Sequence, residues 1–264
     1  MQNCTNLIVG ASHAGLCALD AIRMIDADSS IIMATRENHL PYSPTVLPYV
    51  VSGRSDPEKV RLRSEVYFQE KKVSFLKNAC LKSLDTANNK AQFENGQSIG
   101  YEKLLLATGA SPILPPIPGL KDVPIHVLRT MDDALKLKAA MQKGKRALVL
   151  GAGLIGTHAA ENMAEAGMQV TMVEAKGQVL PGYFDQDASG LIASAFKQHG
   201  IELVFGKSVR EVKPGKAILD DGSEIAFDLL MVATGVNPSL DYLKGSGVKT
   251  DNGILVDEVQ RTNI

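Results

Sequence analysis

Short apolar runs alternate with glycine-rich turns and amphipathic stretches along this chain. Four compact apolar runs predict strands, at Leu7–Val9, Ile31–Met33, Ala147–Leu150 and Val170–Val173. Within each pair of runs, apolar positions recur with helical spacing, which predicts helices over Ala14–Met24 and Ile155–Ala166, the second ending at Gly167. The order strand, turn, helix, strand therefore occurs twice and indicates an α/β fold.

Further along each half, a turn signal precedes a longer apolar run. Asn95–Gly96 and Asp221–Gly222 are dipeptides typical of hairpin turns. Leu104–Ala107 and Leu229–Ala233 are continuous apolar runs, so we expect strands that are buried on both faces. Each half thus adds a hairpin region and a central strand to its strand–helix–strand unit.

These correspondences form an internal repeat. Asn95–Pro112 reads NGQSIGYEKLLLATGASP, and Asp221–Pro238 reads DGSEIAFDLLMVATGVNP. The turn residues, the isoleucine, the aromatic–acidic pair, the apolar run, Ala-Thr-Gly and the final proline all correspond, which indicates one module used twice. Between the copies, Ser111–Gly119 contains four prolines. Because proline continues neither a helix nor a central strand, we expect a linker there.

The glycine spacing of the second module is typical of dinucleotide binding. Gly151, Gly153 and Gly156 follow a predicted strand and open a predicted helix. The first glycine permits a tight turn, the second lets the backbone approach a pyrophosphate, and the third lets the helix pack on the strand. The N–H groups at the helix N-terminus bind the phosphate charge. Glu174 ends the next strand, where its carboxylate accepts hydrogen bonds from the ribose hydroxyls and repels a 2′-phosphate, so we expect NADH.

The corresponding turn of the first module, residues 10–15, is less regular. Ser12 replaces the middle glycine, which reduces backbone proximity to a ligand and adds a hydroxyl. Glu37 is the expected ribose carboxylate, although Thr35 lies nearer to the end of the predicted strand. His13 lies in the turn, where in one interpretation it contacts the pyrophosphate or the ring edge of a bound dinucleotide and in the other it is a solvated turn residue.

The chain resembles the FAD-dependent pyridine nucleotide–disulfide oxidoreductase superfamily over essentially its whole length. The resemblance is carried by VGASHAG, LLLATGASP, VLRTMDDAL, VLGAGLIGTHAAENMAEAGMQVTMVE and LLMVATGVNP. It implies two Rossmann-like, three-layer ββα dinucleotide-binding domains, with the NAD domain inserted into the FAD domain. We expect the FAD-binding domain at residues 1–113, the NAD-binding domain at 114–242 and a return to the FAD-binding domain at 243–264.

Positions carried over from the family give two sets of cofactor-binding residues. For FAD, the set is Gly10, Ser12, His13, Ala14, Gly15, Glu37, Leu81, Thr108, Gly109 and Arg129. For NAD, the set is Gly151, Gly153, Leu154, Ile155, Gly156, Glu174 and Gly235. Arg129 has an alternative interpretation as a surface partner of Asp132 or Asp133. We expect no catalytic side chain, because the flavin carries the redox chemistry.

Two departures from the family pattern narrow the expected chemistry. Members that use a thiol over the flavin carry a cysteine two residues before Leu-Pro-Tyr, and in PYSPTVLPYVVSG that position is Thr45. In many relatives the NAD turn has an aromatic residue and an acid where this chain has Leu154 and His158. His158 either tunes the flavin surroundings or packs on its helix.

The cysteine-free loop together with LIGTHAAENMAEAG is most similar to the flavin subunits of multi-subunit bacterial oxidoreductases. These are the NADH:acceptor subunits of the phenylglyoxylate dehydrogenase and tungsten aldehyde oxidoreductase types; rubredoxin and ferredoxin reductases are similar too. The resemblance implies hydride transfer between NAD(H) and FAD and electron exchange with an iron–sulfur protein or partner subunit. The alternatives are an NADH oxidase, a coenzyme A-disulfide or persulfide reductase, and a regulatory sensor without turnover.

Composition and charge exclude several other classes. The 264 residues are 45% hydrophobic and carry a formal net charge of −1, without the basic stripe that nucleic-acid binding needs. No stretch approaches the length of a membrane span, and because the first predicted strand begins almost at Met1, we expect no secretion signal. Three widely spaced cysteines favour a reducing cytoplasm, and five dispersed histidines do not favour a metal site. The sequence does not decide whether the protein forms a homo-oligomer or a hetero-oligomer.

The C-terminal end carries one further expectation. In relatives, a match to ILVDEVQRTNI is followed by a Gly-Asp pair whose aspartate holds the flavin ribitol, and this sequence stops at Ile264 before such a pair. We therefore expect that a C-terminal segment follows in the natural protein.

Overall fold

The computed structural model describes residues 2–264. The chain divides into two compact units, each considered by itself. Unit 1 comprises Met1–Ser43, Val60–Ser111 and Asn237–Ile264, and unit 2 comprises Pro44–Lys59 and Pro112–Val236. The expected domain boundaries at 113/114 and 242/243 stay a prediction. The two units differ from these boundaries chiefly in one respect: the short segment 44–59, which lies within the expected FAD-binding domain, belongs to unit 2.

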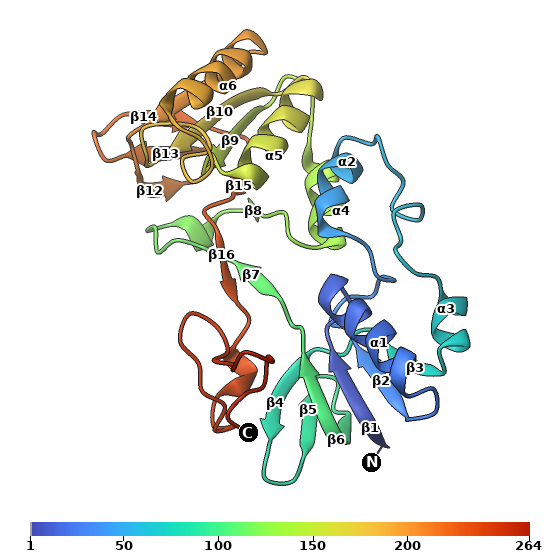
Figure 1. Ribbon diagram of the computed structural model, residues 1–264. Helices are drawn as coiled ribbons and strands as arrows, with labels where there is room; N and C mark the ends of the chain where they lie inside the picture. The colour runs from blue at the N-terminus through green and yellow to red at the C-terminus, as the bar shows by residue number, and fades with distance from the viewer. Residues whose placement is uncertain (1) are drawn as a thin grey trace. The chain divides into compact units, whose positions relative to one another are not determined.

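Unit 1 is built on a six-stranded sheet with the order β3-β2-β1-β6-β5-β4. Its strands are β1 (Gln2–Val9), β2 (Ile31–Ala34), β3 (Val73–Leu76), β4 (Leu81–Asp85), β5 (Lys90–Phe93) and β6 (Ser98–Leu106). The first three and β6 are parallel, whereas β4 and β5 extend the sheet as an antiparallel hairpin region. The helices are α1 (His13–Ile25), α3 (Glu65–Glu70) and the 3-10 turn η3 (Asp241–Leu243). Figure 1 labels the six strands and the helices α1 and α3.

Helix α1 forms because its apolar positions recur on one face. Leu16 and Leu19 on that face pack against Ile8 of β1 and Met33 of β2. The opposite face of the sheet has its own core, in which Leu7 and Ile32 pack with side chains of the β4–β5 region and of η3. Burial on both faces explains why β1 and β2 read as continuous apolar runs.

One expectation about unit 1 is wrong in part. Leu104–Ala107 lies in and just after β6, but its side chains are only half-buried. The pairing of β5 with β6 ends at Gly100, so the C-terminal half of β6 has no second neighbour among residues 2–264. The apolar run can be recognised in the sequence. Whether a second strand covers it depends on where β5 stops pairing with β6, which the sequence does not show.

Unit 2 repeats the plan with a clearer separation into layers. Its parallel sheet has the order β11-β10-β9-β15-β8, and β12-β13-β14 form a separate antiparallel sheet. The strands are β8 (Ile125–His126), β9 (Arg146–Leu150), β10 (Gln169–Glu174), β11 (Ile201–Phe205), β12 (Val209–Lys213), β13 (Lys216–Leu219), β14 (Glu224–Ala226) and β15 (Leu229–Val232). The helices are α2 (Leu47–Val51), α4 (Met131–Ala140), α5 (Leu154–Glu165) and α6 (Gln186–Gln198), with 3-10 turns η1 (Pro44–Val46) and η2 (Leu120–Asp122).

The core of unit 2 confirms the three-layer ββα arrangement. Leu148 and Leu150 of β9 pack against Val212 and Leu219 of the antiparallel sheet. Leu229–Ala233 matches its expectation, because the whole of β15 is buried between β9 and β8. The two expected hairpin turns close β5–β6 and β13–β14. The Rossmann-like fold class is thus confirmed for the repeated module.

The chain passes between the units four times, and two of these crossings lie in extended segments. They are β7 (Ala110–Pro112) and β16 (Val236–Pro238), which form a two-stranded sheet. The first of them begins the proline-rich stretch that the sequence marks as a linker. Among residues 2–264, no helix has the length and apolar character needed to cross a membrane.

Candidate dinucleotide-binding sites

The two glycine-rich turns have the same pattern of burial. Each turn follows the central strand of its sheet, β1 or β9, and leads into α1 or α5. We number each turn from its first glycine, Gly10 or Gly151. In both turns, positions 2, 6 and 7 are buried, position 3 is half-buried, and positions 4 and 5 are exposed. The exposed pair is His13 and Ala14 in unit 1, and Leu154 and Ile155 in unit 2. Both turns therefore present the N-terminus of a helix outward, as anion binding requires.

Two of the glycines in each turn are required by the fold itself. A Cβ on Gly10 would lie 2.0 Å from the carbonyl oxygen of Ala107, and a Cβ on Gly151 would lie 2.4 Å from that of Ala233. Both glycines also have positive φ, at 112° and 101°. A Cβ on Gly15 would lie 1.9 Å from the oxygen of Gly10. The corresponding distance from Gly156 to Gly151 is 2.0 Å, so the close packing of helix on strand is repeated.

The middle glycine of the second turn has a different explanation. Gly153 has a φ of −79°, which any residue adopts. No atom of the described residues lies within 4 Å of a Cβ built on it. The fold therefore does not require glycine at this position, and its expected role in the approach of a ligand stays a prediction. Ser12 occupies the equivalent position in unit 1, where it is half-buried and caps α1 without a side-chain capping bond.

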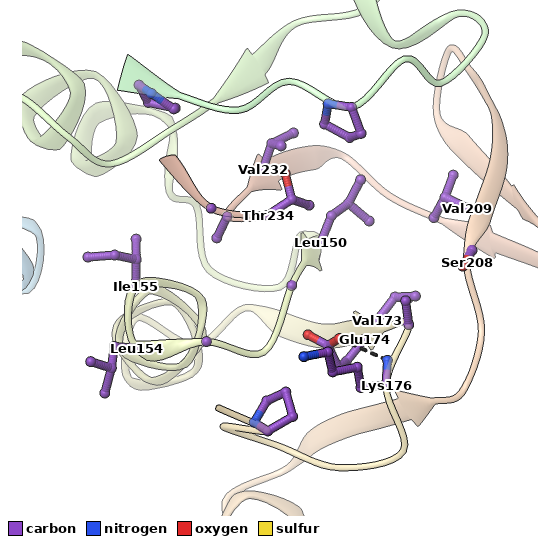
Figure 2. A pocket seen from close by; sticks show the side chains of 18 of the residues that line it. Leu150, Leu154, Ile155, Val173, Glu174, Lys176, Ser208, Val209, Val232 and Thr234 are labelled. Atoms are coloured by element: carbon purple, nitrogen blue, oxygen red, sulfur yellow. Dashed lines mark hydrogen bonds between the residues drawn. The ribbon is translucent and has the colours of Figure 1, made fainter. Parts of the chain in front are cut away.

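A pocket of about 700 Å³ opens beside the second turn, entirely within unit 2. Figure 2 shows Leu154 and Ile155 on the first turn of α5 at one end, and Glu174, Lys176 and Ser208 at the other. The walls between them are apolar and include Leu150, Val173, Val209 and Val232. Gly235, which has a φ of 119°, lines the end near α5. The volume is in the range of small-molecule and cofactor sites.

Glu174 is held at the end of β10 by two backbone N–H groups. Its Oε2 accepts from Ala152 N at 2.8 Å, and its Oε1 accepts from Lys176 N at 2.9 Å. Ala152 belongs to the glycine-rich turn, so the carboxylate is fixed beside that turn. Each oxygen keeps a lone pair for a ribose hydroxyl. The residues of this pocket thus fit a dinucleotide without a 2′-phosphate.

Glu37 occupies a different place relative to its turn. In the parallel pairing Val9 lies opposite Ala34, as Leu150 lies opposite Val173, so the equivalent of Glu174 is Thr35. The half-buried Glu37 lies two residues further on and accepts a 2.5 Å hydrogen bond from the Tyr42 hydroxyl. The nearby Leu81 begins β4 and is buried. The roles of Glu37 and Leu81 in FAD binding stay predictions.

The other expected FAD residues of unit 1 lie at the carboxyl ends of its strands. Thr108 and Gly109 follow β6, and Gly109 has a φ of 67°. The Thr108 hydroxyl lies 2.9 Å from the Tyr242 hydroxyl and 3.4 Å from the carbonyl oxygen of Ser239. Burial raises the pKa of Tyr242, so this phenol stays protonated at neutral pH. Sequence reasoning missed Tyr242, which lies 134 residues beyond Thr108.

Two expected residues lie elsewhere. Arg129 belongs to unit 2 and precedes α4, where its backbone N–H donates to Asp133 at 3.1 Å. The same Asp133 carboxylate accepts from Thr130 N in the capping box of α4, so this acid serves the helix end. His158 is exposed on α5, with its Nδ1 3.8 Å from Glu161 one turn on. Contact of Arg129 or His158 with a flavin stays a prediction.

The three cysteines are free thiols with different exposure. Cys4 is buried on β1, Cys17 is exposed on α1 and Cys80 is half-buried before β4. Burial raises the pKa of the Cys4 thiol, and burial with the nearby Glu94 charge raises that of Cys80. Both shifts oppose the thiolate form that reactive cysteines need. Thr45 is exposed in η1 and supplies no thiol.

Comparison with known proteins extends these observations. The sequence profile described as pyridine nucleotide-disulphide oxidoreductase matches residues 5–264. The epsilon subunit of an NADH-dependent phenylglyoxylate dehydrogenase from Aromatoleum evansii is 52% identical over 260 residues, covering 97% of this chain and 62% of that protein. An NADH oxidase from Methanocaldococcus jannaschii is 31% identical over 270 residues, covering 98% of this chain and 60% of that protein.

A solved structure agrees with the fold. The crystal structure of a ferredoxin reductase from Rhodopseudomonas palustris superposes with a TM-score of 0.90 at 30% identity, covering 98% of this chain and 65% of that one. The chain spans about three fifths of the length of these relatives.

Proposed function

The chain belongs to the pyridine nucleotide-disulphide oxidoreductase family, as its motifs indicated, and on that premise we propose that it binds FAD in unit 1 and NAD(H) in unit 2. In this proposal electrons pass between NADH and an acceptor through the flavin, which makes the protein an FAD-dependent NADH:acceptor oxidoreductase. The name of the 52% identical relative, an NADH-dependent dehydrogenase subunit, supports this assignment.

Gly153 is the observation that carries the proposal. Its backbone is unstrained and its Cβ position is open, so the fold does not require a glycine there, and close approach of a ligand gives a reason for one. The exposed N-terminus of α5 adjoins that open position and attracts a diphosphate. Glu174 lies at the far end of the same pocket, where it accepts hydrogen bonds from an adenosine ribose. The three features together fit a dinucleotide in extended form.

The chain's own residues bind and orient rather than react. Leu154 and Ile155 present apolar side chains at the end of the pocket near Gly235, where they exclude water from a nicotinamide ring. In unit 1, Ser12 and His13 lie at the N-terminus of α1 for a diphosphate, and Glu37 supplies a carboxylate for a ribose. Bound FAD supplies the chemistry that links two-electron transfer by NADH to one-electron transfer.

An iron–sulfur protein or subunit is the proposed electron partner. The similar ferredoxin reductase supports this, since ferredoxins carry iron–sulfur clusters. The raised thiol pKa values of Cys4 and Cys80 and the absence of a thiol at Thr45 argue against a disulfide or persulfide substrate. Three free thiols also favour a cytoplasmic location.

Anaerobic mixing of the FAD-loaded, full-length protein with NADH tests the proposal. We expect the flavin absorbance to bleach and to recover on addition of an oxidised ferredoxin. Absence of bleaching would contradict the enzyme assignment and would favour a dinucleotide-binding sensor. Recovery with oxygen alone, at the rate seen with ferredoxin, would instead favour an NADH oxidase like the 31% identical relative.

A further inference from the structure

Two neighbouring residues of unit 1, Tyr42 and Ser43, each contact a residue of the proposed FAD site. The Tyr42 hydroxyl donates to Glu37 Oε2 over 2.5 Å, and Ser43 Oγ lies 3.0 Å from His13 Nε2 in a hydrogen bond. We propose that Tyr42 is a positioning residue that fixes the Glu37 carboxylate for the adenosine ribose of FAD. The inference rests on the proposed function in two respects, that FAD occupies unit 1 and that Glu37 binds its adenosine ribose.

Glu37 needs such a partner because of its place in the chain. Its backbone is fixed, since its N–H donates to Thr35 Oγ1 at 3.3 Å and its carbonyl oxygen accepts from Asn78 N at 3.2 Å. The carboxylate itself stands on three rotatable bonds beyond the end of β2. A side chain that is already oriented loses less conformational freedom when ligand binds, and this raises affinity.

Tyr42 is well placed to supply that orientation. It is only 6% exposed, and its backbone forms an antiparallel bridge with Arg61. The adjacent Pro41 carbonyl oxygen accepts from Leu62 N at 2.6 Å. The phenol ring has few rotatable bonds, so a buried tyrosine on a fixed backbone holds its hydroxyl in one position. A hydroxyl that donates to an ionised carboxylate makes a stronger bond than a neutral pair does.

The Tyr42 bond leaves the carboxylate able to bind ligand. An ionised carboxylate has about four acceptor positions, and the phenol uses one of them on Oε2. The remaining positions suffice for two ribose hydroxyls. In unit 2 the N–H of Ala152 uses one position on Glu174 in the same way. Tyr42 thus orients Glu37 as the N–H of the glycine-rich turn orients Glu174.

Binding of FAD to the flavin-free, full-length protein tests this role through the quenching of flavin fluorescence. We expect Tyr42→Phe to raise the dissociation constant of FAD about tenfold, which corresponds to about 1.4 kcal/mol. Glu37→Gln should raise it at least as much, and the double variant should resemble Glu37→Gln alone. Tyr49→Phe, at an exposed tyrosine seven residues further on, should leave the FAD constant unchanged.

Several outcomes would overturn the inference. A wild-type FAD constant in Tyr42→Phe, or effects of Tyr42→Phe and Glu37→Gln that multiply in the double variant, would show that Tyr42 does not act through Glu37. A parallel loss of NADH affinity in Tyr42→Phe would show a general structural role. Failure of the wild-type protein to bind FAD would instead refute the proposed function, so the two failures are distinguishable.

Discussion

The two modules share one steric design and differ in how each holds its ribose acid. Gly10 and Gly151 make the same tight approach to the end of a neighbouring strand, and Gly15 and Gly156 make the same helix packing. The acids differ, because Glu174 is bonded to its own turn whereas Glu37 is bonded to Tyr42. The fold therefore fixes the glycines that shape the turn, and ligand chemistry is set by residues that the fold leaves free.

The largest expected effect comes from breaking the shared design. Gly15→Ala and Gly156→Ala each place a Cβ within about 2 Å of a backbone oxygen, at 1.9 Å and 2.0 Å. Because backbone must shift to relieve the clash, each substitution should cost about 3 kcal/mol or more and lower the melting temperature by roughly 10 °C. Differential scanning calorimetry measures the melting temperatures of both variants and of the wild type.

Gly190→Ala is the matched control for the steric prediction. A Cβ there meets no described atom within 4 Å, and the residue lies inside α6. Alanine should stabilise the helix by up to about 1 kcal/mol. If Gly15→Ala and Gly156→Ala melted as Gly190→Ala does, the equivalence of the two turns would lose its physical basis.

The next effect concerns the acid of unit 2. Glu174→Ala removes the acceptor for two ribose hydroxyls and the repulsion of a 2′-phosphate, so it should weaken NADH binding and admit NADPH. We expect wild-type kcat/KM to favour NADH by about 100-fold or more and the variant to favour it by less than about tenfold. Glu161→Ala, at an exposed acid on α5, is the control. Equal wild-type values for the two cofactors would remove Glu174 from this role.

A third substitution makes the second turn like the first. Gly153→Ser introduces the residue found at position 12, in a conformation that serine adopts readily. Stability should change by less than about 0.5 kcal/mol, because serine is a favoured helix N-cap. The dissociation constant of NADH should rise about tenfold, since the Cβ occupies space for the diphosphate. A large drop in melting temperature with unchanged NADH affinity would show that the fold, not the ligand, requires this glycine.

A smaller effect on stability concerns an ion pair at the start of β9, in unit 2. Arg146 at the start of β9 pairs with Asp228 at 3.1 Å, which lowers the Asp228 pKa to about 2. A lowered folded-state pKa stabilises the protein above the unfolded value of about 4, and this stabilisation is lost as the pH falls toward 2. Asp228→Asn should therefore melt slightly below wild type at pH 7, and the difference should vanish in acid. A difference that persisted at pH 2 would contradict the ion pair as its cause.

The smallest expected effect is that of removing the thiols. The triple Cys4→Ser, Cys17→Ser, Cys80→Ser variant should keep its NADH-dependent reduction of an artificial one-electron acceptor, because none of the three cysteines occupies the family's thiol position, which is Thr45, and because the pKa values of Cys4 and Cys80 are raised. Reductive titration of the wild type should consume about two electrons per FAD. If the triple variant lost most of its activity while retaining FAD, the result would favour the disulfide-reductase alternative.

The six strands and two helices predicted from the sequence each overlap a strand or helix of the structure, because apolar runs and helical spacing are local signals. The other strands and helices were not predicted individually. The spacing of the turn glycines and of Glu174 is a local signal as well, and the structure places Glu174 beside its turn; the cofactor-binding roles of these residues stay predictions. The sequence did not reveal the contacts of Tyr42, Ser43 or Tyr242, since these depend on how separate segments meet. The half-buried state of Leu104–Ala107 was missed for the same reason, because burial depends on a neighbouring strand.

Crossed binding titrations test the central claim, that one module holds FAD and the other holds NADH. Calorimetric titration of the flavin-free, full-length protein should give one FAD and one NADH per chain. Glu37→Gln should raise only the FAD dissociation constant, and Gly153→Ser should raise only that of NADH. If each variant weakened both cofactors equally, or if Glu37→Gln impaired NADH alone, the assignment of the two modules would be wrong.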